Sequence, residues 1–215
     1  MYYPAFLDLK GKDCVVIGGG KVSLRKVNSL INCGARISVF APEVVPELES
    51  LAQAGKIIFE KKAYEPDDLV GASLIICATD DSELNADIAR EAKDRGLLVN
   101  VVNEPEVGNF IVPSTLRRGK LAIAVSTGGT SPALAKKIRE KLEGQFGPEY
   151  ELFLEAMENF RKKAQQKLNE EERKEFFSKL IDSDLMDKIR SGWNAGRIEK
   201  AIEEQMNQFL THENR

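Results

Sequence analysis

The chain has 215 residues, of which 42% are hydrophobic, so it is long and apolar enough to bury a sizeable core. Its 31 basic and 34 acidic residues leave a formal net charge of −3 at pH 7, which favours neither nucleic acid nor an anionic membrane as a partner. No apolar run approaches a membrane span of about 20 residues, and the three cysteines form no Cys-x-x-Cys pair. We therefore expect reduced thiols and a cytoplasmic location. With His212 as the only histidine, we expect neither a histidine triad nor a metal site.

The first half of the chain alternates short apolar runs with amphipathic segments, which is the pattern of a parallel sheet with helices on both faces. The expected strands are 13–19, 36–40, 56–60, 73–79 and 97–102, and the expected helices are 21–33, 44–54 and 82–95. This half is therefore predicted to be an α/β domain with a Rossmann-type parallel sheet.

The pattern changes after residue 108. Two further strands, 109–113 and 120–126, are expected without a helix between them, and the chain from Pro132 onward favours helices. We predict a nucleotide-binding domain at 1–112, a small α+β segment at 113–145 that connects two strands and a helix, and a helical domain at 146–215.

A glycine-rich turn links the first strand to the first helix. In this setting glycine exposes backbone N–H groups to a pyrophosphate at a helix N-terminus, although a purely structural turn would have the same composition. Ser23 stands at the last position of the dinucleotide fingerprint, where a small residue is needed. The predicted cofactor-binding residues of this turn are Gly18, Gly19, Gly20, Lys21 and Val22.

The ends of two other strands supply further candidates for the cofactor site. Pro42 and Glu43 follow the second strand, where an acid usually binds the ribose hydroxyls. No arginine there would pair a 2′-phosphate, so NAD is favoured over NADP. Thr79 and Asp80 close the strand 73–79, at the strand end where α/β sheets bind ligands. The alternative for this stretch is a helix N-cap by Asp81 or Ser82.

A second glycine loop precedes the helix at Pro132. Ser131 is suited to be its N-cap, and such a helix N-terminus binds carboxylates or phosphates. Basic side chains nearby would suit a polyanionic substrate, but a solvated basic helix face explains them equally well. They are Arg117, Arg118, Lys120, Lys136, Lys137 and Arg139.

The motifs together resemble the precorrin-2 dehydrogenases of siroheme biosynthesis. The resemblance covers about residues 1–145, in the order Gly18-Gly19-Gly20-x-Val22, Ala78-Thr79-Asp80-Asp81, Asn100-Val101-Val102, Asn109-Phe110-x-x-Pro113 and Ala124 to Pro132. It implies NAD-dependent oxidation of precorrin-2, a polycarboxylate tetrapyrrole, to sirohydrochlorin. It also implies a homodimer formed through the middle segment, and a tetrapyrrole bound between the nucleotide site and the helical domain.

The resemblance also implies roles for single residues. Thr127 matches a hydroxyl residue facing the site, and Asn109 matches a polar substrate contact, although both side chains would also suit hydrogen bonding within a loop. Asn103 stands where relatives that also insert iron have aspartate, and asparagine cannot accept a proton at neutral pH. The expected catalytic residues are Asn103 and Thr127. The expected substrate-binding residues are Asn109, Ser126, Gly128, Gly129 and Thr130.

Three alternatives stay open from the sequence. A bifunctional dehydrogenase and ferrochelatase would need Asp80, Glu104 or Glu106 to replace the missing acid. A non-catalytic NAD-sensing domain would leave the loop from Ser126 to Pro132 unexplained. A catalytically dead interaction module is disfavoured by the intact glycine turn.

Overall fold

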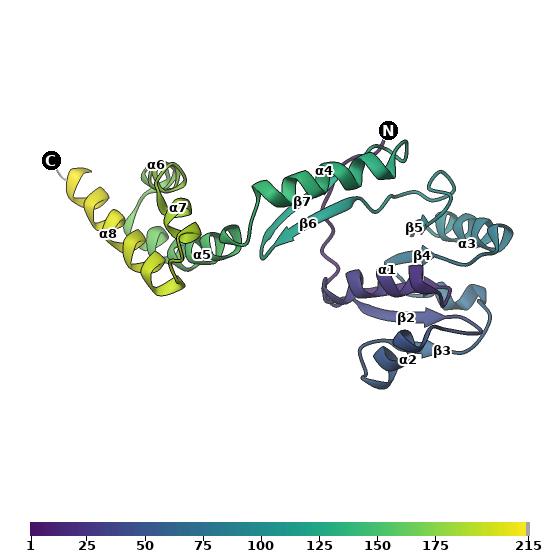
Figure 1. The fold of residues 1–215 in the computed structure, drawn as a ribbon. Helices are drawn as coiled ribbons and strands as arrows, with labels where there is room; N and C mark the ends of the chain where they lie inside the picture. Colours follow the sequence, from purple (N-terminus) through teal and green to yellow (C-terminus); the bar gives the residue numbers. More distant parts are fainter. Residues whose placement is uncertain (214–215) are drawn as a thin grey trace. The chain divides into compact units, whose positions relative to one another are not determined.

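The computed structural model describes residues 1–213. The chain folds into two compact units, Met1–Val112 and Pro113–Arg215 (Figure 1). Among the described residues, no helix combines the length and apolarity needed to cross a lipid bilayer.

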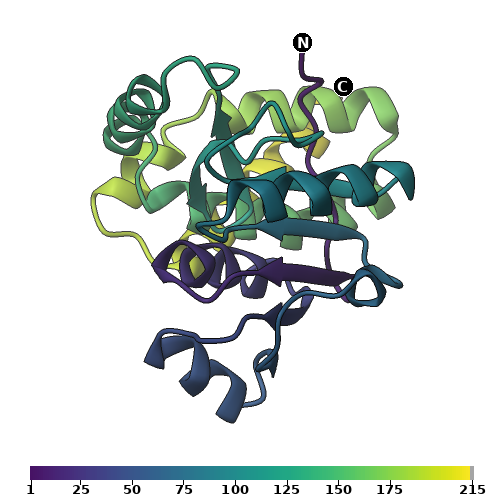
Figure 2. The ribbon, with the colours of Figure 1, turned by 90° about the vertical axis from the view of Figure 1, so that its right-hand side faces the viewer.

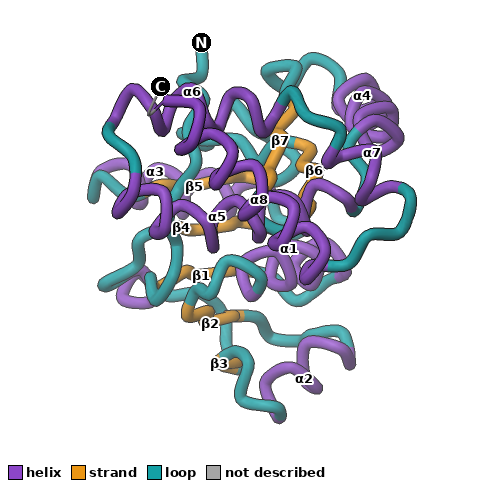
Figure 3. The backbone as a smooth tube through the Cα atoms, turned by 90° about the vertical axis from the view of Figure 1, so that its left-hand side faces the viewer, coloured by secondary structure: helices purple, strands orange, loops and turns teal. Residues whose placement is uncertain are grey.

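The first unit is a five-stranded parallel sheet. Its strands follow the spatial order β3-β2-β1-β4-β5 (Figures 2 and 3), which is the order of the first five strands of a doubly wound nucleotide-binding sheet. The strands are β1 (Asp13–Ile17), β2 (Arg36–Phe40), β3 (Ile58–Glu60), β4 (Leu74–Cys77) and β5 (Leu98–Val101). The α/β class and the parallel sheet predicted from the sequence are confirmed.

The helices of this unit cover both faces of the sheet. They are α1 (Lys21–Ile31), α2 (Pro46–Gln53), the 3-10 helix η1 (Pro66–Leu69) and α3 (Ser82–Asp94). Alternate strand residues face opposite sides, so two separate cores form. Val16 and Val39 pack with Val27 of α1 and Leu48 of α2, whereas the opposite face of the sheet packs against α3 and η1.

The second unit begins with an antiparallel hairpin and continues as helices. Strands β6 (Ser114–Arg118) and β7 (Leu121–Val125) pair around Gly119, and α4 (Pro132–Gln145) packs on them. The helices that follow bury an apolar core of their own. They are α5 (Glu149–Lys167), α6 (Glu170–Ile181), α7 (Leu185–Arg190) and α8 (Ala195–Glu213).

One predicted strand is wrong. Residues 109–113 form no strand, and β6 starts at Ser114, directly after Pro113. Proline has no backbone N–H to donate to a ladder, and the side chain of Asn109 is bonded instead to the backbone of β5. The apolar run at 109–113 therefore connects the two units, and Phe110 packs against the core of the first unit.

Candidate nucleotide-binding site

The glycine turn lies at the carboxyl end of β1 and its backbone is tightly enclosed. Gly18 has φ +116°, and a Cβ atom there would lie 2.4 Å from the carbonyl oxygen of Ala78. A Cβ on Gly19 would lie 1.9 Å from the carbonyl oxygen of Glu43. Glycine is thus required at both positions, because any side chain would push apart the ends of β1, β2 and β4.

Gly20 differs from the two glycines before it. A Cβ atom built on Gly20 meets nothing within 4 Å, and the residue is the N-cap of α1 in extended backbone. The first N–H groups of a helix have no partner within it, and no acidic side chain lies in the first turn of α1. The positive end of α1 is therefore available to an anion.

A cavity of about 610 Å³ opens at this edge of the sheet. The nine residues predicted to bind the cofactor all line it, although they come from three separate segments of the chain. They are Gly18, Gly19, Gly20, Lys21, Val22, Pro42, Glu43, Thr79 and Asp80.

The charges around the cavity favour a ribose with free hydroxyls. Glu43 is exposed at the rim after β2, where its carboxylate would repel a 2′-phosphate. Lys62, which precedes the lining residue Ala63, lies over the ring of Phe40 but is held by Asp68 at 2.7 Å and Glu65 at 3.0 Å. A second phosphate would thus find a carboxylate and a lysine that is already paired.

Of the residues that follow β4, Asp81 and Thr79 stabilise the local structure and Asp80 is available at the cavity. Asp81 caps α3 by accepting the N–H of Leu84 at 3.0 Å, so the N-cap alternative holds for Asp81. Thr79 donates to the Oδ1 of Asn85 at 2.8 Å, which fixes the turn. Among residues 1–213, the Asp80 carboxylate has no hydrogen-bond or ion-pair partner, so it is available at the cavity.

Sequence reasoning missed one wall of the cavity. Ala63 and Tyr64, between β3 and η1, line it together with Leu84 of α3. The Tyr64 hydroxyl donates to Glu91 at 2.7 Å, and burial together with this carboxylate raises the pKa of the phenol above its usual range. Their loop follows a short strand and contains no motif, so only the fold reveals that it joins the site.

The cysteines offer no nucleophile beside the cavity. Burial raises the pKa of Cys77, the last residue of β4, to about 12 and that of Cys14 in β1 to about 11. Both thiols thus stay protonated at neutral pH. Among residues 1–213, no group of three or more histidine, cysteine or acidic residues could hold a metal ion.

Two predicted site residues follow β5. Asn109 binds the strand itself, because its Nδ2 donates to the Leu97 carbonyl at 2.7 Å and its Oδ1 accepts the Val99 N–H at 2.8 Å. Its amide therefore holds the chain after β5 in place. Asn103 is exposed, and within the described residues its side chain has no polar partner.

The predicted substrate loop lies in the second unit, between β7 and α4. Ser126 accepts the Gly128 N–H at 3.1 Å, and Thr127 accepts the Ser131 N–H at 3.0 Å. Ser131 caps α4 by accepting the Leu134 N–H at 3.3 Å, as its sequence position predicts. Gly128, Gly129 and Thr130 are exposed, so the loop presents backbone and a hydroxyl at the N-terminus of α4.

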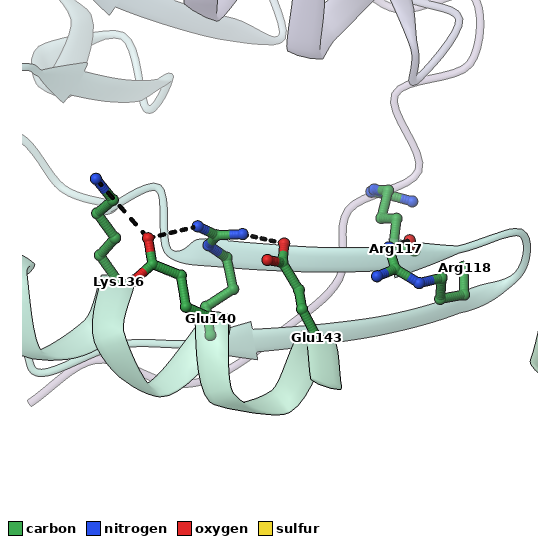
Figure 4. A network of polar contacts seen from close by, with 6 residues as sticks. Arg117, Arg118, Lys136, Glu140 and Glu143 are labelled. Atoms are coloured by element: carbon green, nitrogen blue, oxygen red, sulfur yellow. Dashed lines mark hydrogen bonds and ion pairs between the residues drawn. The ribbon is translucent and has the colours of Figure 1, made fainter. Parts of the chain in front are cut away.

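The basic residues beyond this loop are partly neutralised by their neighbours. Arg139 of α4 pairs with Glu143 and Glu140, and Lys136 lies 3.8 Å from Glu140. Figure 4 shows Lys136, Glu140 and Glu143 side by side on this helix. The pairs Lys136–Glu140 and Arg139–Glu143 follow the spacing of one turn along the helix. This side of α4 is therefore a paired, solvated face, and less positive charge is left for a substrate than the sequence suggests.

Two family models match consecutive parts of the chain. A family model described as putative NAD(P)-binding matches residues 5–114, and a second, described as sirohaem biosynthesis protein central, matches residues 118–145. The first model covers just over half of the chain and includes every residue that lines the nucleotide cavity.

Similar proteins are found among curated sequences and solved structures. Siroheme synthase of Nitrosomonas europaea is 35% identical over 217 residues, which cover 99% of this chain but 46% of that protein. For siroheme synthase of Chromobacterium violaceum the identity is 36%, over 94% of this chain and 44% of that protein. The chain therefore spans less than half the length of these relatives.

A solved structure matches over its whole length. SirC, a precorrin-2 dehydrogenase, superimposes with a TM-score of 0.78 at 27% identity, covering 94% of this chain and 100% of that chain. The chain thus belongs to the family of NAD(P)-binding proteins that the first model describes, and it is similar to proteins of siroheme biosynthesis.

Proposed function

We propose that this protein catalyses the NAD-dependent dehydrogenation of precorrin-2 to sirohydrochlorin. The observation that carries the proposal is the cavity at the carboxyl ends of β1, β2 and β4, where a glycine turn, an uncapped helix N-terminus and an acid at the rim come together. The similarity to SirC over almost the whole chain supports the choice of substrate.

The residues around the cavity suit a dinucleotide. The N-terminus of α1 at Gly20, with Lys21 beside it, would hold the pyrophosphate, and Glu43 would accept hydrogen bonds from the ribose hydroxyls. Bound NAD supplies the hydride acceptor. The chain's own task is to bind and orient the substrate, and the hydroxyl-rich loop from Ser126 to Ser131 is our candidate for holding its carboxylates.

Dehydrogenation releases a proton as well as a hydride. Asn103 cannot take that proton at neutral pH, so it is proposed to orient the substrate by hydrogen bonding, as is Thr127 through its hydroxyl. Asn109 supports Asn103 indirectly, because its amide holds the chain after β5.

The cofactor site is tested by a charge placed at Gly20. Gly20→Asp sets a carboxylate where the pyrophosphate would lie, so NAD affinity measured by calorimetry is expected to fall at least about tenfold. Gly20→Ala is the matched control, because its Cβ meets nothing within 4 Å, and it is expected to bind NAD within about threefold of the unchanged protein. Equal NAD affinity in both variants would contradict the site.

We further propose that the protein is a homodimer formed through residues 113–145. Strands β6 and β7 form an isolated two-stranded sheet, which is marginally stable alone, and Leu121, Ile123 and Val125 are only partly buried in it. Pairing with a second copy would cover these side chains and the open strand edges. Sedimentation equilibrium is expected to give twice the 23.9 kDa chain mass, and a monomer at micromolar concentration would contradict this.

A further inference from the structure

The second unit contains a groove that shares no residue with the nucleotide cavity. Its volume is about 790 Å³, which lies within the range of about 300–1,000 Å³ typical of small-molecule sites. It is lined by the β6–β7 turn, α5 and α6, through Lys120, Leu154, Met157, Glu158, Arg161, Gln165, Glu170, Arg173, Lys174 and Phe177.

Helix α5 has one face that packs in the helical core and an adjacent face that lines the groove. Phe153, Ala156, Phe160 and Ala164 pack in the helical core at the spacing of one face. The adjacent face carries Leu154, Met157, Glu158, Arg161 and Gln165 at the same spacing, and all five line the groove. Helix α6 repeats this arrangement with Glu170, Arg173, Lys174 and Phe177.

The groove is locally positive in a chain whose formal net charge is −3. Lys120 is paired with Glu158, and Lys174 lies 2.8 Å from Glu170, so these charges cancel. Within the described residues, Arg161 and Arg173 form no such ion pair.

Arg173 and Arg161 keep their charge available. The Nη1 of Arg173 donates to the Leu168 carbonyl at 2.7 Å, which orients the guanidinium but leaves its charge uncompensated. Within the described part of the chain, Arg161 has neither a hydrogen-bond nor an ion-pair partner. A guanidinium binds a planar carboxylate through two parallel N–H groups, so two unpaired arginines in one groove favour an anion of that kind.

The groove is also apolar along part of its wall. Met157 and Phe177 pack against the helical core and extend to the groove, and Leu154 is half-buried but lies outside that core. A leucine on a second helix face, away from the core, gains burial only when something covers it. An inorganic anion would leave this wall uncovered.

We propose that the groove binds an amphipathic carboxylate. Arg161 and Arg173 hold the carboxylate, while Leu154, Met157 and Phe177 hold the apolar body. Two sources fit this chemistry, namely a carboxylated tetrapyrrole and a long-chain fatty acid.

The test uses the whole chain and dansyl-undecanoate, a fluorescent fatty acid. Saturable binding at one site per chain is expected, and Arg161→Gln is expected to weaken it about tenfold. Lys162→Gln is the matched control, because Lys162 is the next residue on the exposed side of α5 and does not line the groove. The methyl ester of the probe, which lacks the carboxylate charge, is expected to bind about tenfold more weakly to the unchanged protein.

Competition identifies the source of the ligand. Displacement by coproporphyrin III supports the site with a tetrapyrrole as its ligand, and displacement by dodecanoate supports it with a fatty acid. Equal affinity of Arg161→Gln and Lys162→Gln, or displacement by inorganic phosphate as effective as that by dodecanoate, would overturn the proposal. Arg173→Gln repeats the test from α6 if the first variant loses its far-UV circular dichroism.

Discussion

In the proposed function, Asn103 is the residue that decides whether metal insertion accompanies dehydrogenation. It follows β5 as an exposed side chain, and within residues 1–213 it has no polar partner that would fix it for a structural role. An amide donates and accepts hydrogen bonds but takes no proton at neutral pH. We therefore expect dehydrogenation without metal insertion, because insertion requires removal of protons from the ring nitrogens.

Replacing Asn103 with aspartate restores an acceptor for those protons. Asn103→Asp is expected to introduce or raise metal insertion into sirohydrochlorin, measured anaerobically by absorbance after addition of cobaltous ion, by about tenfold or more. Asn103→Ser is the control, since it also removes the amide but adds no carboxylate. Unchanged insertion in the aspartate variant would mean that the missing acid is not the cause.

At the scale of secondary-structure elements, one ion pair ties the start of α5 to the end of α7. Arg190 Nε lies 2.9 Å from Glu149, whose side chain is 11% exposed. Burial raises the pKa of this carboxyl, but backbone N–H groups at the helix start and the Arg190 guanidinium outweigh it, so the pKa lies below its usual value. A lowered pKa means that the ionised form stabilises the folded state.

The lowered pKa of Glu149 determines how the stability of the fold depends on pH. The contribution of Glu149 is fully present above about pH 4.5, the ordinary pKa of a glutamate, and is lost as the pH falls through the lowered value in the folded protein. Arg190→Gln, which also removes the exposed pair with Asp187, is expected to lower the urea midpoint at neutral pH and to shift acid unfolding to higher pH.

Urea unfolding monitored by circular dichroism from pH 7 down to pH 3 measures both effects. Arg197→Gln removes the same charge from α8, where among the described residues its guanidinium has no partner, and it is the control. An equal loss of stability in the two variants would show that total charge, and not the pair with Glu149, is responsible.

The sequence was most informative where elements are continuous and apolar. The strands at 36–40 and 73–79 and the helices at 21–33 and 82–95 appear within a few residues, because burial on both faces of a sheet demands such runs. The run 109–113 has the same composition, yet it forms no ladder. Its place is fixed by the amide of Asn109 and by Pro113, and these effects depend on contacts distant in sequence.

In the candidate site, too, some residues could be predicted from the sequence and others could not. The residues of the glycine turn and the strand ends could be predicted because they belong to motifs, and the structure brings all nine around one cavity. Tyr64 could not be predicted, because it lies in an irregular loop that reaches the cavity through its bond to Glu91 on α3. The pairing of Arg139 with Glu143 was not predicted either, although their spacing of four residues along a helix indicates it.

At the scale of the whole molecule, the chain forms two units with separate apolar cores, and each unit carries different candidate sites. The first unit holds the nucleotide cavity, and the second holds the hydroxyl-rich loop, the hairpin and the groove between α5 and α6. The relatives named siroheme synthase are more than twice as long as the part that this chain matches. The dehydrogenase activity is therefore proposed for these two units only.

Anaerobic mixing of the purified protein with precorrin-2 and NAD tests that claim most directly. We expect one NADH for each sirohydrochlorin formed, followed by no further absorbance change when ferrous ion is added until a separate chelatase is supplied. Absence of NADH formation from a protein that binds NAD normally would contradict the claim and would favour a regulatory domain that senses NAD.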